Sequence, residues 1–136
     1  MADGGELVVL APGVAEFGED AAIDALIRKH GYRGREATLR AVAGNEDLRR
    51  DLSAAAHLIH GSPEGRFSVT YCPGKLTRGE VEGVGYGYSP LDEALRAWEP
   101  SARKAGWNTA SSGERFYFVP NPALGLWASA GRLTGR

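Results

Sequence analysis

The histidines best placed to do chemistry together are His57 and His60, which stand three residues apart. The apolar spacing around them predicts a helix over residues 46–60, and on a helix this spacing puts both imidazoles on one face. Ser53, four residues before His57, extends that face. The three side chains could contact a substrate or transfer protons. They could equally form an ordinary helix end, with His60 favourably placed against the helix dipole and His57 half-buried.

A metal site at these histidines would need further ligands, and the obvious nearby donors are Glu64 and Cys72. The sequence therefore favours the absence of a metal site at these residues. Cys72 is the single cysteine, which excludes an internal disulfide and fits a reducing compartment. It ends a predicted strand with neither a helix start nor a base beside it, so we expect an unreactive thiol.

The loop over residues 12–20 joins a predicted strand to a predicted helix and carries Glu16 and Phe17. Its glycines and the helix start resemble a phosphate-binding loop. It lacks the glycine spacing of dinucleotide-binding loops and the P-loop lysine, and its three carboxylates would repel phosphate. We therefore expect a solvated loop or a carboxylate-lined rim, with Glu16 and Phe17 facing a cleft.

Tryptophan and tyrosine side chains could stack on a sugar or a base, but their spread along the chain favours packing in the core and at interfaces. No basic groove accompanies them, and the formal net charge is -1, so nucleic acid is not an expected partner. The residues concerned are Tyr71, Tyr86, Tyr88, Trp98, Trp107, Tyr117 and Trp127.

The elements that would position these side chains alternate between strands and helices. Apolar or aromatic runs predict strands over residues 6–11, 66–72, 85–88 and 114–119, and helical spacing predicts helices over 20–29, 35–43, 46–60, 77–84 and 89–98. Asp20 is a plausible N-cap, Thr77 and Glu80 form a capping-box pattern, and residues 101–113 read as a loop. Crossover connections of this kind predict an α/β fold. We expect a single three-layer, Rossmann-like domain with a small, mostly parallel sheet flanked by helices.

In such sheets a ligand binds beyond the carboxyl ends of the strands. The predicted ends fall at residues 11–13, 72–74 and 120–122, which all combine proline with small residues. These three segments are therefore the expected rims of a site.

Length and composition bound the remaining possibilities. A chain of 136 residues suits one domain, which we place at residues 1–128 with a flexible tail over 129–136. No apolar run approaches the ~20 residues of a membrane span. Acidic residues precede the first apolar run where a signal peptide would be basic, so we expect a cytoplasmic protein without contact with a membrane.

Five phrases in order resemble the C-terminal region of nickel-dependent lactate racemase-like proteins. The likeness covers residues 3–128 and is strongest to a subgroup linked to sugar-acid epimerisation, such as mannonate epimerase. The phrases are residues 3–12 (DGGELVVLAP), 16–20 (EFGED), 53–62 (SAAAHLIHGS), 70–74 (TYCPG) and 121–127 (NPALGLW).

The resemblance implies a fragment of a racemase or epimerase that acts on a 2-hydroxy acid. In that family an N-terminal domain supplies acid–base histidines and a lysine that tethers a nickel pincer nucleotide, and hydride is removed from the substrate and returned to its other face. The C-terminal domain forms a wall of the cleft, with its first long helix facing the site. Residues 51–53 lack the tryptophan that lactate racemases carry in this helix, which implies another substrate.

From this resemblance we expect Ser53, His57 and His60 to face the cleft, and no catalytic residue or cofactor in this chain. Its partners would be the missing N-terminal catalytic domain and a small hydroxy-acid substrate, and the chain would be inactive alone. Two alternatives remain. One is a stand-alone module that binds a small anion or sugar acid through the same three side chains. The other is a structural domain that forms homo-oligomers through an exposed interface, for which residues 121–127 are a candidate.

Overall fold

The computed structural model describes residues 3–124, whose contacts fall into two compact units, Met1–Ala94 and Leu95–Arg136. The first unit contains a three-stranded parallel sheet with strand order β1-β2-β3, formed by β1 (Glu6–Ala11), β2 (Ser68–Pro73) and β3 (Gly87–Tyr88). Helices flank this sheet, so the predicted α/β class with a small parallel sheet is confirmed. In the part of the chain between residues 3 and 124, no helix has the length and apolar character needed to span a membrane.

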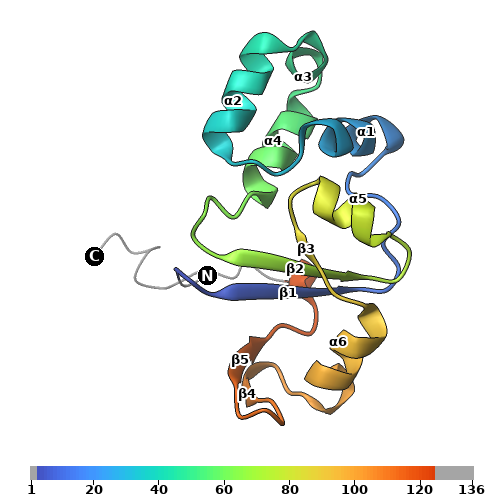
Figure 1. The fold of residues 1–136 in the computed structure, drawn as a ribbon, viewed down its shortest axis with the longest axis vertical. Coiled ribbons are helices and arrows are strands. Elements are labelled where there is room, and N and C mark those ends of the chain that lie inside the picture. The colour runs from blue at the N-terminus through green and yellow to red at the C-terminus, as the bar shows by residue number, and fades with distance from the viewer. Residues whose placement is uncertain (1–2, 125–136) are drawn as a thin grey trace. The chain divides into compact units, whose positions relative to one another are not determined.

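Several helices of the first unit lie on one side of its sheet (Figure 1). They are α1 (Ala21–His30), α2 (Arg35–Gly44), α3 (Glu46–Arg50), α4 (Leu52–Gly61) and α5 (Arg78–Gly83). Their inward side chains form the core, in which Ile27, Leu48, Leu58 and Val81 are fully buried. A sixth helix, α6 (Leu91–Trp98), begins in this unit and continues into the second.

Capping residues set the helix boundaries as the sequence predicts. The Asp20 carboxylate accepts hydrogen bonds from the backbone N–H groups of Ala22 and Ile23 at the start of α1. Gly31 ends that helix with a φ of 68°, a left-handed conformation that favours glycine. Thr77 and Glu80 form the predicted capping box at α5.

The predicted single helix over residues 46–60 is wrong, because Asp51 divides it into α3 and α4. The backbone leaves helical geometry at Asp51, with φ and ψ of -124° and 83°, and the Asp51 carboxylate accepts from the N–H of Ala54. A carboxylate can satisfy a free N–H at a helix start, and this offers the backbone an alternative to an unbroken helix. Leu48 and Leu58 are still buried in the same core.

The second unit contains an antiparallel hairpin, and here two predictions are wrong. Residues 101–113, expected as a loop, include strand β4 (Gly106–Thr109), which follows a short 3-10 helix, η1 (Pro100–Ala102). Strand β4 pairs with β5 (Arg115–Phe118), so the last predicted strand exists but lies outside the parallel sheet. The 3-10 helix η2 (Pro122–Leu124) follows it. Residues 120–122 therefore follow a strand of the hairpin and not a strand of the parallel sheet. The proposed tail over 129–136 lies outside the described residues, as does Trp127.

The other two predicted rims do meet at the carboxyl ends of β1 and β2. The backbone N–H of Gly74 donates to the carbonyl of Ala11 at 3.1 Å. A Cβ atom at Gly74 would lie 2.3 Å from the carbonyl oxygen of Pro12, a distance that no side chain tolerates. The two segments therefore close against each other at this edge of the sheet.

Candidate functional site

The centre of the candidate site is a histidine–tyrosine pair between α4 and the turn after α1. The Tyr32 hydroxyl and Nδ1 of His57 lie 3.2 Å apart, within hydrogen-bonding distance. Burial of the Tyr32 ring raises its pKa to about 12, so the phenol remains protonated at neutral pH. A protonated phenol can donate to Nδ1 in the tautomer whose Nδ1 carries no proton.

Tyr32 is held by a row of aromatic rings that crosses the first unit. Its ring stacks on Tyr86 with centroids 4.5 Å apart and planes inclined by 7°. Tyr86 is followed by Tyr71, at 6.1 Å, and Tyr71 by Phe17, at 6.4 Å. The row thus joins two residues predicted from the sequence to face a cleft, His57 at one end and Phe17 at the other.

Gly61, the last residue of α4, makes this stacking possible. A Cβ atom there would lie 2.4 Å from Cε1 of Tyr32 and 3.0 Å from the Tyr86 hydroxyl. The Tyr86 hydroxyl instead donates to the Gly61 carbonyl at 2.7 Å. Burial and the neighbouring Tyr32 raise the pKa of Tyr86, so this donor keeps its proton at neutral pH.

The predicted site residues on α4 differ in how far they are exposed to solvent. Ser53 and His60 are exposed on α4, and His57 between them is half-buried, whereas Ala54, Ala55 and Leu58 face the core.

In the loop after β1, Glu16 is exposed, but Phe17 is only 9% exposed and packs in the core. The backbone N–H of Phe17 donates to Asp24 at 2.7 Å, and the Arg28 guanidinium lies 5.2 Å from its ring centroid. Phe17 therefore anchors this loop to α1.

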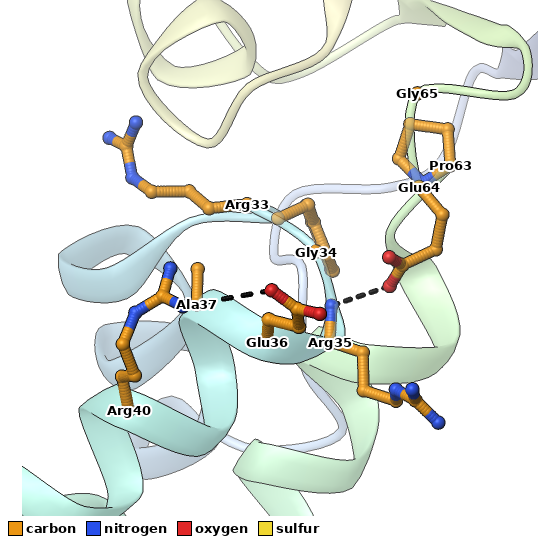
Figure 2. Close-up of a pocket in the computed structure, with 10 residues that line it drawn as sticks. Arg33, Gly34, Arg35, Glu36, Ala37, Arg40, Pro63, Glu64 and Gly65 are labelled. Carbon is orange, nitrogen blue, oxygen red and sulfur yellow. Dashed lines mark hydrogen bonds and ion pairs between the residues drawn. The ribbon is translucent and has the colours of Figure 1, made fainter.

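A hollow of about 480 Å³ adjoins Tyr32 at the start of α2. Its wall carries three arginines and two glutamates, and Figure 2 shows their side chains. The lining residues are Tyr32, Arg33, Gly34, Arg35, Glu36, Ala37, Arg40, Pro63, Glu64 and Gly65. The hollow lies by the loop that leads into the amino end of β2, not at the carboxyl edge where a ligand was expected.

Protein carboxylates already engage two donors of this hollow. Glu64 accepts from the backbone N–H of Arg35 at the first turn of α2, and the Arg40 guanidinium lies 3.8 Å from the Glu36 carboxylate. The guanidinium groups of Arg33 and Arg35 point in different directions (Figure 2). None of these arginines was predicted to be a site residue, although arginines on both sides of a glycine at a helix start were a visible signal.

The described residues offer little to a metal or to thiol chemistry. Between residues 3 and 124, no group of three or more His, Cys, Asp or Glu side chains is arranged to hold a metal ion. Cys72 is fully buried, and burial raises the pKa of its thiol. A buried thiol with a raised pKa is a poor nucleophile, as the sequence predicted.

Comparisons with known proteins bear on the fold alone. No family model matches the chain, and no curated protein matches it. A crystal structure of a Thermotoga maritima protein, from a structural genomics consortium, superposes with a TM-score of 0.55 at 22% sequence identity. The match covers 68% of this chain and 24% of that protein, so the shared fold makes up about a quarter of a longer chain there.

Proposed function

We propose that this chain is the C-terminal α/β domain of a nickel-pincer-nucleotide-dependent racemase or epimerase that acts on a 2-hydroxy acid, such as a sugar acid. Two observations support this. Five residue phrases resemble that family in order along the chain, and a similar fold forms about a quarter of a longer Thermotoga protein. The partner would be an N-terminal catalytic domain in the cytoplasm, and the chain would be inactive without it.

The observation that carries the proposal is the division of α4 into two faces. Ala54, Ala55 and Leu58 hold the helix against the core, while Ser53 and His60 remain exposed. A helix anchored in this way can present polar side chains to a second domain without moving. The resemblance places this helix at the wall of the cleft, so we assign Ser53, His57 and His60 to substrate contact. The bond to Tyr32 would hold His57 in one orientation.

The described residues do not fit the nickel cofactor by themselves. They provide no cluster of metal ligands, and among their lysines Lys29 is engaged by Asp47, 2.6 Å from its carboxylate. The hydride chemistry that the resemblance implies would be supplied by a cofactor held outside these residues. In this proposal the N-terminal domain holds the cofactor, and the present chain supplies only side chains that orient the substrate.

The test is reconstitution. We expect no epimerisation of mannonate or other aldonic acids by the chain alone, and activity when it is combined with the N-terminal domain loaded with the nickel cofactor. In the reconstituted enzyme, His60→Gln should lower kcat/KM at least ~10-fold, the effect of one lost polar contact to a substrate. The matched control is Arg50→Gln, an exposed change on α3. Full activity from the chain alone, or none after reconstitution, would overturn the proposal.

A second candidate function is a stand-alone module that binds small anions, and the arginine-lined hollow favours it. Its volume of about 480 Å³ suits a sugar acid, and Arg33 and Arg35 could turn their exposed side chains toward a carboxylate. Calorimetry with a panel of aldonic acids tests it directly. A heat of binding that the Arg35→Gln variant no longer shows would support this function. The absence of any heat of binding with every aldonic acid would exclude it.

A further inference from the structure

The hairpin of the second unit has one packed face and one exposed face, both aromatic. On the packed face, Phe116 contacts Trp98 edge to face with centroids 5.0 Å apart, and the Arg103 guanidinium lies 5.8 Å from the Phe116 centroid. Arg103 also donates to the carbonyls of Trp98 and Thr109, at 2.9 and 3.3 Å. Side chains of the same unit therefore engage the Phe116 face of the hairpin.

The exposed face carries Trp107, Tyr117 and Arg115. Trp107 and Tyr117 are direct cross-strand partners, and their rings meet at 89° with centroids 5.5 Å apart. The Arg115 guanidinium lies 5.0 Å from the Trp107 centroid. Trp107 is 66% exposed and Tyr117 is 51% exposed, which is unusual for rings of this size.

We propose that this face binds a sugar ring that bears a carboxylate. The C–H groups of a pyranose stack on an indole, whose apolar face is large and rigid. The Arg115 guanidinium at the same place matches a carboxylate in charge and in bidentate geometry. Thr109, paired with Arg115 across the hairpin and exposed on the same face, adds a hydroxyl that can bond to the ring hydroxyls of the sugar.

Two other occupants fit this face less well. A stable protein interface buries ~800 Å² on each partner, which is far more than two half-exposed rings and one arginine can provide. A single-stranded nucleic acid needs a basic groove that follows several phosphates, and the chain has a net charge of -1. A ligand the size of one or two sugar rings suits the area. The proposal does not depend on the proposed racemase function.

The experiment is an NMR titration of the full chain, followed at the tryptophan indole N–H signals, with glucuronate, glucose, acetate and adenosine monophosphate as probes. We expect glucuronate to shift the Trp107 signal with a millimolar Kd. Glucose should bind several-fold more weakly, and acetate should shift nothing. Trp98, at the end of α6, packs against Phe116 on the other face of the hairpin, so its signal reports whether the hairpin remains folded.

Two variants separate the contributions of the ring and the charge. Trp107→Ala should weaken glucuronate binding roughly 5- to 10-fold, measured at the Tyr117 ring signals. Arg115→Gln should abolish the preference for the acid, so that the variant binds glucuronate and glucose with similar affinity. No shift with glucuronate, a shift reproduced by acetate, or stronger binding of adenosine monophosphate would overturn the proposal. So would a concentration-dependent dimer that Trp107→Ala abolishes, because the face would then be an interface between two copies.

Discussion

Replacing Gly61 with alanine should unfold the first unit more easily, although alanine is the better helix former. The added Cβ would meet Cε1 of Tyr32 at 2.4 Å and Cδ1 at 2.8 Å. Tyr32 cannot turn aside without losing its stack on Tyr86 and its bond to His57. Such overpacking costs about 1–3 kcal/mol, and the gain in helix propensity offsets at most ~1 kcal/mol of it.

We therefore expect Gly61→Ala to lower the free energy of unfolding by about 1–2 kcal/mol, which corresponds to a fall in Tm of roughly 5–15 °C for a unit of this size. The assay is urea and thermal unfolding followed by far-UV circular dichroism, with near-UV dichroism to report the tyrosine stack. Gly44→Ala is the matched control, since Gly44 also ends a helix but has no atom within 4 Å of the position that an added Cβ would take. It should be neutral or stabilise by up to ~1 kcal/mol. If the two variants proved equally stable, the close packing of Tyr32 against Gly61 would be refuted.

Three further predictions follow from burial and charge. Leu58→Ala should cost about 2–5 kcal/mol of stability, because Leu58 is fully buried, while Leu52→Ala on the same helix should stay within ~0.5 kcal/mol. The buried Cys72 thiol, whose pKa is raised by burial, should react with Ellman's reagent only on unfolding, whereas a Ser53→Cys variant should gain a thiol that reacts at once. The backbone N–H and hydroxyl of Thr77, together with Arg28, lower the pKa of Glu80 from 4.5 to about 2. A lowered folded-state pKa stabilises the protein above about pH 4.5 and loses its effect as the pH falls toward 2, so Glu80→Gln should flatten acid unfolding over that range.

Each of these has a clear contrary outcome. Equal losses from Leu58→Ala and Leu52→Ala would mean that α4 does not pack by the face described. Rapid labelling of Cys72 in the folded protein would show that the carboxyl end of β2 opens easily. An acid-unfolding curve unchanged by Glu80→Gln would show that the hydrogen bonds from Thr77 do not form.

The first unit was largely predictable because its signals are local. Asp20 and the Thr77–Glu80 box each act within a few residues along the chain, and each is found as expected. The break at Asp51 was missed because the apolar spacing continues through it, so that periodicity alone indicates one helix. The signal that could have shown the break was chemical, a carboxylate three residues before the N–H of Ala54.

The hairpin was missed because the sequence of its first strand carries almost no strand signal. Strand β4 has the sequence GWNT, in which a glycine and an asparagine weaken the strand signal, and it exists because β5 pairs with it. Pairing between separate segments leaves no mark on a short polar stretch. The hollow beside Tyr32 depends in the same way on residues 63–65 coming to lie against the start of α2.

The closed carboxyl edge of the sheet decides where a ligand can bind in the first unit. In open α/β sheets that edge normally holds the ligand. Here Gly74 approaches the Pro12 carbonyl so closely that not even a Cβ atom would fit between them, and Phe17 and Leu76 are buried near these segments. The open surface is found instead on the helices, at the outer face of α4 and at the hollow before β2. A ligand or a second domain that uses this unit should therefore be recognised by His57, His60 and the arginines of α2 rather than by the strand ends.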